Sequence, residues 1–217
     1  MKKKEKRLFI CGLGLIAAFA VWTLLIKTVD VQNVGQGKTD IGFAAFNIWF
    51  HKLTGVNMAL YIVTDWLGLI PLLVCLIFGG VGLFQLIKRK SLLKVDCDII
   101  LLGIYYILVI FGYLIFEAVP INYRPILIGG FMEASYPSST TLLVLSVMPT
   151  LVFQADRRLK SNAAKKAVSI FSVLFSAFMV IGRLISGVHW FTDILGAVML
   201  SAGLYCLYKA ASLLLLN

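Results

Sequence analysis

A histidine and an aspartate four residues apart are the side chains of this sequence best suited to chemistry. His189 and Asp193 stand where a helix is expected to begin, so they share one helical face. A carboxylate beside an imidazole fixes its tautomer and leaves the opposite ring nitrogen free to act as a nucleophile. Arg183 ends the preceding apolar segment, and Gly187 allows the chain to turn back. The alternative is a hydrogen-bonded pair that stabilises a helix start.

A second segment offers groups that bind phosphate. Arg124 directly precedes a proline, which biases the arginine towards an extended backbone. Farther on, a proline is followed by Ser138, Ser139 and Thr140, which is typical of a helix start with free N–H groups and hydroxyls. Helix N-termini bind phosphate. Plain helix capping is the alternative interpretation.

Brought together, these groups would form a site for phosphoryl transfer. Two arginines and a helix start suit a doubly charged oxyanion. A histidine aimed at that oxyanion would act by covalent catalysis. The hypothesis requires all these residues to lie at the same end of the molecule, so it depends on the elements that carry them.

Those elements are predicted to be membrane-spanning helices. The 217 residues are 60% hydrophobic and 14% charged, with a mean hydropathy of +0.95. The apolar residues form long blocks, and a bilayer core of ~30 Å needs roughly 20 of them in a helix. We expect one all-α membrane domain over 1–217. Its spans are predicted over 8–26 (an uncleaved first helix), 58–87, 97–116, 138–153, 167–185 and 190–216.

The distribution of basic residues predicts the orientation. The net charge is +10, and most lysines and arginines flank the first span or lie in the second-to-third and fourth-to-fifth connections. With six spans, these positions share one side, which the positive-inside rule makes cytoplasmic, as in a plasma membrane. Both termini are then inside, and the candidate site faces outward. This arrangement explains the charge better than nucleic-acid binding does.

The first outward segment contains an amphipathic stretch over 41–53. Phe43, Phe46 and Phe50 recur at helical spacing on one face, and Asn47 and His51 belong to a narrow polar stripe. We expect a helix lying in the outer interface, with a packed capping helix as the alternative.

The motifs taken in order resemble those of the type 2 phosphatidic acid phosphatase family of membrane enzymes, which is related to vanadium haloperoxidases. The family's motifs are K-x6-R-P, P-S-G-H and S-R-x5-H-x3-D. The resemblance covers roughly residues 41–204 and implies six helices with a site on the outer face. The matching residues in this chain are Arg124-Pro125, then Pro137-Ser138-Ser139-Thr140, then Arg183, His189 and Asp193.

The resemblance also implies roles for these residues. His189 would be the nucleophile that forms a phosphohistidine, and Asp193 would orient it. The substrate would be a lipid phosphate or diphosphate, with no metal or cofactor. The side chains implied to hold the phosphate oxygens are Arg124, Arg183, Ser138, Ser139 and Thr140.

Three positions depart from the family pattern. Glu117 stands where the first-motif lysine would fall, Thr140 replaces the second-motif histidine, and Gly182 replaces the first serine of the third motif. The family's histidine protonates the leaving group, which threonine cannot do efficiently. Glu117 or Glu133, both in or beside the outer segment that carries Arg124, are candidate substitute acids.

Two further interpretations stay open. The enzyme could act on a polyprenyl diphosphate such as undecaprenyl diphosphate, because a phosphate leaving group departs more easily than an alkoxide. Alternatively, the chain is a non-catalytic relative that binds or transports an anionic phospholipid. Asp65, early in the second span, is a weaker functional candidate. The four cysteines show no metal-ligand spacing and are expected to be packing residues.

Overall fold

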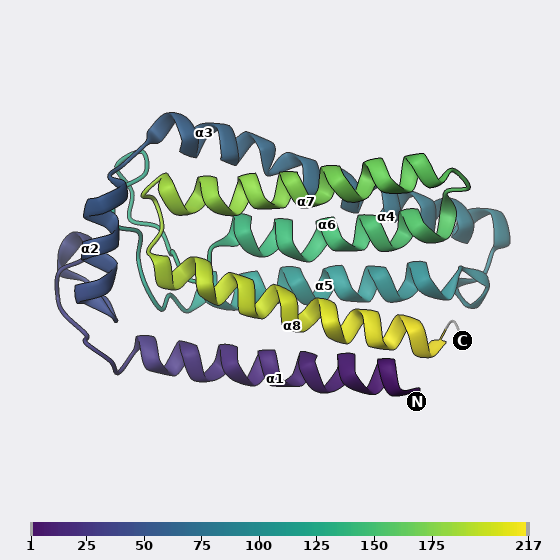
Figure 1. Cartoon of the computed structure of the whole chain (residues 1–217), viewed down its shortest axis with the longest axis horizontal. Helices are drawn as coiled ribbons and strands as arrows, with labels where there is room; N and C mark the ends of the chain where they lie inside the picture. The colour runs from purple at the N-terminus through teal and green to yellow at the C-terminus, as the bar shows by residue number, and fades with distance from the viewer. Residues whose placement is uncertain (1, 216–217) are drawn as a thin grey trace.

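The computed structural model describes residues 2–215 and consists of helices that run side by side (Figure 1). The all-α fold with six membrane-spanning segments is confirmed, because six helical stretches are long and apolar enough to cross a bilayer. The last residue of the predicted span over 190–216 lies outside the described residues. The helices are α1 (Lys3–Ile26), α2 (Ala44–Thr54), α3 (Met58–Leu67), α4 (Leu69–Arg89), α5 (Cys97–Ala118), α6 (Ser139–Arg158), α7 (Asn162–Ile185) and α8 (Phe191–Leu215).

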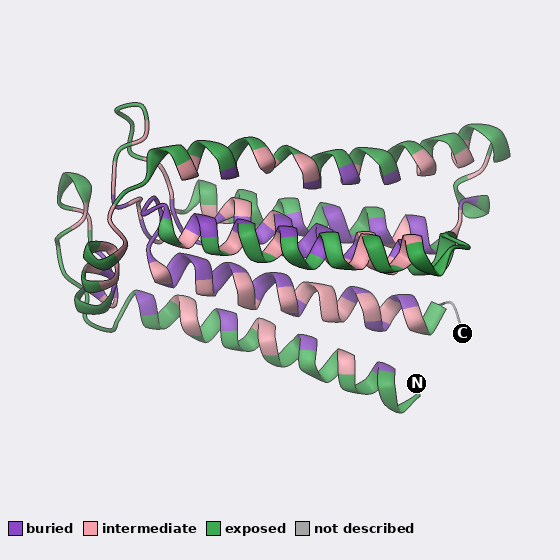
Figure 2. Ribbon diagram, turned by 45° about the horizontal axis from the view of Figure 1, so that its top comes forward, coloured by how far each residue is buried: buried purple, intermediate pink, exposed green. Residues whose placement is uncertain are grey.

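The outward faces of the bundle are apolar and the interior is partly polar. Figure 2 shows buried positions on the faces that the helices turn towards one another. Large apolar side chains such as Leu76, Ile107 and Leu174 stay more than 60% exposed. Such surfaces are stable only in contact with lipid. The buried interior instead holds hydrogen-bonded polar groups, such as the Tyr106 hydroxyl 2.8 Å from the Thr150 hydroxyl.

The second span differs from the single helix predicted over 58–87. It is broken at Gly68 into α3 and α4. Pro71 lies in the first turn of α4 and has no N–H to donate to the carbonyl of Leu67, so the helix bends where that hydrogen bond is missing. The break directs α3 along α7, while α4 packs against α5 and α6.

The predicted interfacial helix over 41–53 is observed as α2, which lies across one end of the bundle (Figure 1). Its amide Asn47 is buried and donates to the hydroxyl of Thr192 at 3.0 Å. Phe46 and Phe50 pack edge-on against Phe191 at the start of α8. Its other face is open, since Trp49 is 57% exposed. The helix is therefore both amphipathic and packed, and it fixes the start of α8.

The opposite end of the bundle carries the start of α1 and the end of α8 (Figure 1). A charged cluster lies there as well. Asp98 on α5, whose side chain is only 6% exposed, pairs with Arg158 at 2.7 Å and Arg157 at 3.5 Å on α6. Arg89 pairs with Asp96 at 2.7 Å. These ion pairs join α4, α5 and α6 at the end that lies away from the candidate site.

Candidate active site

The loop between α7 and α8 presents His189 and is held by the α2–α3 connection. Gly187 has φ +70°, and a Cβ there would lie 2.0 Å from the carbonyl oxygen of Gly55, so only glycine fits. The His51 Nε2 lies 3.0 Å from the Gly187 carbonyl, and the amide of Asn57 donates to the carbonyl of Ser186 at 3.0 Å. The turn predicted at Gly187 is thus built by contacts from a distant segment.

His189 and Asp193 are linked through a serine rather than directly. The His189 Nδ1 lies 3.8 Å from the Asp193 Oδ2, which is too far for a direct hydrogen bond. The Ser135 hydroxyl fills the gap, 3.0 Å from Nδ1, and donates to Oδ2 at 2.5 Å. In this arrangement Nδ1 donates to Ser135, and Nε2 keeps its lone pair.

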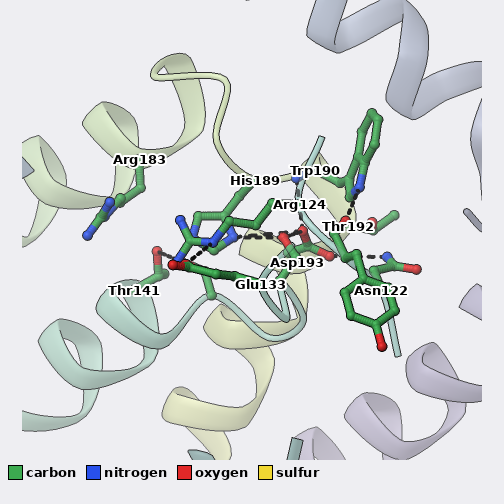
Figure 3. Close-up of polar contacts among 12 residues, drawn as sticks. Asn122, Arg124, Glu133, Thr141, Arg183, His189, Trp190, Thr192 and Asp193 are labelled. Carbon is green, nitrogen blue, oxygen red and sulfur yellow. Dashed lines mark hydrogen bonds and ion pairs between the residues drawn. The ribbon is translucent and has the colours of Figure 1, made fainter. Parts of the chain in front are cut away.

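The Asp193 carboxylate is fully buried and accepts three hydrogen bonds (Figure 3). Besides Ser135, the Asn122 amide donates to it at 3.2 Å and the backbone N–H of Trp190 at 2.9 Å. Buried charge needs such partners, because it has lost its hydration. The carboxylate therefore has a fixed orientation, and the Trp190 bond also caps the start of α8.

The environment of His189 favours its neutral form. Burial lowers the pKa of His189 to about 4, the nearby Asp193 carboxylate opposes this, and Arg124 and Arg183 add to the lowering. At neutral pH the imidazole is therefore uncharged. Its Nε2 is buried and has no hydrogen-bond partner in the described chain. A neutral imidazole with a free, oriented Nε2 is the state that a nucleophile requires.

The two arginines of the motifs meet at one aromatic ring. The Arg183 guanidinium carbon lies 4.8 Å from the centre of the Tyr61 ring, and that of Arg124 lies 5.8 Å from it. Arg124 is paired through Nε with Glu133 at 3.1 Å. Nη1 of Arg124 and both Nε and Nη1 of Arg183 are buried without a hydrogen-bond partner among residues 2–215. Buried donors without partners are rare in proteins, and they mark a place for an anion.

Arg183 also has two close partners within the chain. Its Nη2 donates to the Asp65 Oδ1 and to the Thr140 Oγ1, both at 2.6 Å. Arg183 is only 1% exposed, whereas the Asp65 side chain is 58% exposed. The position of the missing family histidine is therefore occupied by a threonine that contacts this arginine.

His189, whose Nε2 has no hydrogen-bond partner among the described residues, lines a small cavity of about 80 Å³. Both proposed substitute acids, Glu117 and Glu133, line this cavity together with His189 and Arg124. The lining residues are Tyr113, Phe116, Glu117, Arg124, Glu133, Ala134, Ser135, Tyr136, Pro137, Ser139 and His189.

The three hydroxyls predicted to bind phosphate have different surroundings. Ser139 lines the cavity, whereas Ser138 is fully buried and donates its hydroxyl to Thr141 at 3.1 Å. The Ser138 amide donates to the Asp193 carbonyl at 3.2 Å, so it ties the start of α6 to α8. Thr140 contacts Arg183 and not the cavity. Ser138 therefore has a structural position, because the N-cap residue of α6 turns inward.

A larger apolar groove adjoins the cavity. It has a volume of about 390 Å³ and lies between α4, α5 and α6. Tyr113 and Ser139 line both spaces, so the groove begins where the cavity ends. Asp65 and Thr140 line the groove beside Leu69, Leu72, Val109, Ile110, Leu142 and Leu143.

Three residues of the site were missed by sequence reasoning. Ser135, Asn122 and Tyr61 belong to none of the motifs. Ser135 and Asn122 are single polar residues in a loop, and Tyr61 is a single aromatic residue in the apolar helix α3, so none of them carries a periodic signal. Ser135 and Asn122 flank the antiparallel bridge between Tyr123 and Ala134, which brings the two parts of this loop together. Their only sequence signal was that they are polar residues in the segment that carries Arg124.

Comparison with known proteins finds a solved membrane protein with a similar fold. The chain is similar to the crystal structure of the first transmembrane PAP2-type phosphatidylglycerolphosphate phosphatase from Bacillus subtilis, with a TM-score of 0.66. The two chains are 18% identical, over 93% of this chain and 95% of the other, so the likeness is one of fold. No curated protein matches the sequence.

The family itself follows from the sequence match. The model of the PAP2 superfamily matches residues 99–213, which is more than half of the chain. The chain therefore belongs to the PAP2 superfamily, and the resemblance to type 2 phosphatidic acid phosphatases is confirmed. It is a multi-pass membrane protein of a family that consists mainly of phosphatases.

Proposed function

We propose that the protein hydrolyses a lipid phosphate or diphosphate through a phosphohistidine at His189. The observation that carries this proposal is the buried, unpartnered Nε2 of a neutral histidine at a cavity that Arg124 also lines. In the proposed reaction Nε2 attacks phosphorus, and the two arginines bind the charge that develops on the oxygens. Ser135 and Asp193 hold the ring and stabilise its positive charge.

The apolar groove supports a lipid as the substrate. With the phosphoryl group beside His189, a hydrocarbon chain would leave through the junction at Tyr113 and Ser139 and lie between α4, α5 and α6. A polyprenyl diphosphate and a diacylglycerol phosphate both match this chemistry. Basic residues near both termini favour a cytoplasmic location for that end, so the site would face the outer side of a plasma membrane.

The test is phosphate release by purified protein in detergent from a long-chain polyprenyl diphosphate and from phosphatidic acid. The wild type should release phosphate and His189→Ala should not. Ser201→Ala is a matched control, because Ser201 is buried in α8 and, among residues 2–215, its hydroxyl bonds only to a backbone carbonyl of its own helix. Retained release in His189→Ala would overturn the proposal.

The absence of a second-motif histidine favours a second candidate function, in which the protein binds or transports a lipid without hydrolysing it. A folded wild-type protein that binds phosphatidic acid vesicles but releases no phosphate from either lipid would favour a role in binding or transporting an anionic phospholipid. Activity should also survive exhaustive chelation, since the proposed steps use no metal. Loss rescued only by a divalent ion would contradict that part of the proposal.

A further inference from the structure

Asp65 lies next to the position where the family's proton-donating histidine is missing. The Asp65 Oδ1 and the Thr140 Oγ1 accept hydrogen bonds from the same Nη2 atom of Arg183, each at 2.6 Å. The two oxygens are therefore no farther apart than the sum of these distances. Asp65 comes from α3 rather than from any of the three motifs.

The expected path of the leaving group leads towards this carboxyl. In an in-line displacement the leaving oxygen departs from the side of phosphorus opposite the attacking atom. The nucleophile lies in the cavity, and the hydrocarbon chain would occupy the groove, so the ester oxygen lies at their junction. The polar residues that line the groove are Asp65, Tyr113, Ser139 and Thr140, and only Asp65 is a carboxylic acid.

The two glutamates are less suitably placed for this step. Glu117 and Glu133 line the cavity on the nucleophile's side and do not line the groove. Asp65 has the reverse arrangement, because it lines the groove and not the cavity.

We infer that Asp65 protonates the leaving oxygen and so replaces the histidine that this chain lacks. This inference rests on the proposed hydrolysis. A phosphoryl group that binds Arg183 takes the guanidinium away from Asp65 and brings a second negative charge close to it. Repulsion between these two negative charges is relieved when the carboxyl carries a proton, as the proposed step requires.

The step balances as follows. The His189 Nε2 forms a bond to phosphorus, the bond from phosphorus to the ester oxygen breaks, and its electron pair stays on that oxygen. The Asp65 carboxyl gives its proton to the oxygen and releases a lipid alcohol. In the second half, water attacks the phosphohistidine, Asp65 accepts a proton from that water, and inorganic phosphate leaves with His189 restored.

The experiment compares the turnover of Asp65→Asn and wild type on two phosphate monoesters, each of which carries an alkyl chain of the same length. One has an alkyl alcohol as its leaving group, and the other has a nitrophenol, which departs without protonation. The variant should lose about 100-fold or more in kcat on the alkyl ester and less than about 3-fold on the nitrophenyl ester. Asp156→Asn, an exposed aspartate at the other end of the bundle, should match wild type on both.

A second variant covers the case in which Asp65→Asn does not fold. Asp65→Glu keeps a carboxylate opposite Arg183 but moves it by one methylene, so it should lower kcat about 10-fold on the alkyl ester alone. Vanadate inhibition should be at least as strong as in wild type in both variants, because neither variant removes an anion-binding arginine. Equal losses on both esters would mean that Asp65 only positions Arg183, and would overturn the inference, as would unchanged alkyl-ester turnover. If the folded wild type released phosphate from neither ester, the proposed function would fall as well.

Discussion

Ser135→Ala tests whether the aspartate acts on the nucleophile through a serine. The Ser135 hydroxyl is the hydrogen-bond partner of the His189 Nδ1 at 3.0 Å, while the Asp193 carboxylate is 3.8 Å away. The substitution leaves a buried N–H without its acceptor, which costs about 1–3 kcal/mol. The Asp193 carboxylate still keeps its bonds from Asn122 and Trp190. The side-chain environment of the carboxylate therefore changes less than that of the ring.

The expected result is a fall in kcat of about 10- to 100-fold, because each 1.36 kcal/mol of lost transition-state stabilisation is a factor of ten. In wild type, the hydrogen bond from Nδ1 to Ser135 would stabilise the positive charge that the ring gains as the phosphohistidine forms. Without this bond, kcat should fall by a larger factor than KM rises. The assay is steady-state phosphate release from a lipid phosphate in detergent. Ser201→Ala provides the same chemical change at a buried site of α8 away from the cavity.

A double-mutant cycle makes the test sharper. If Asp193 acts through Ser135, the substitution Asp193→Asn should cost less in the Ser135→Ala background than in wild type. Simple additivity of the two losses would refute the serine link. So would a folded Ser135→Ala protein whose kcat is within about 2-fold of wild type.

Four further predictions follow from the geometry. Since His189 has a pKa of about 4, the rate of its modification by diethyl pyrocarbonate should fall less than 2-fold between pH 7 and pH 5. For a histidine of ordinary pKa the rate falls by about 20-fold over the same range. A fall of about 20-fold in the rate at His189 would contradict its neutral state. Gly187→Ala should lower the free energy of unfolding by at least about 1–2 kcal/mol and abolish phosphate release, because residue 187 has φ +70° and an added Cβ would clash with a neighbouring carbonyl oxygen. A melting temperature equal to that of wild type would argue against this turn. Asp98→Asn should destabilise the detergent-solubilised protein by about 2–3 kcal/mol without changing KM, since it removes the closest carboxylate partner of Arg157 and Arg158 on α6. A changed KM would link that end of the bundle to the site. Glu133→Gln should strengthen vanadate inhibition up to about 5-fold, because it frees Arg124 from its ion pair. The effect is limited because the Glu133 side chain is 40% exposed. Weaker inhibition would show that the glutamate assists anion binding.

Hydropathy was sufficient to predict the number of membrane spans, because each apolar block must be helical in lipid whatever its partners are. The break at Gly68 could not be predicted in the same way. The residues on both sides of it are equally apolar, and its direction is set by the packing of α3 on α7. The buried ion pairs of Asp98 also depend on the packing of α5 against α6.

The motif spacing predicted which groups would lie near one another, but not how they are connected. His189 and Asp193 were expected to share a helical face, but His189 lies in the loop before α8 begins, and Ser135 from another loop stands between the two side chains. Ser138 belongs to a phosphate-binding motif by its position, yet its hydroxyl turns inward to Thr141. Such details depend on the rotation of each side chain within a packed site, which residue spacing alone does not fix.

The pairing of the first and last helices has a consequence for biosynthesis. α1 packs chiefly against α8, and two glycines make the approach close: a Cβ at Gly12 would lie 2.8 Å from Leu207, and one at Gly203 would lie 2.9 Å from Ile16. A chain made at about 5–20 residues per second would leave α1 in the membrane for roughly 10–40 s before its partner arrives. α8 also carries Asp193, so the close packing of α1 and the geometry of the proposed site should form together when α8 inserts.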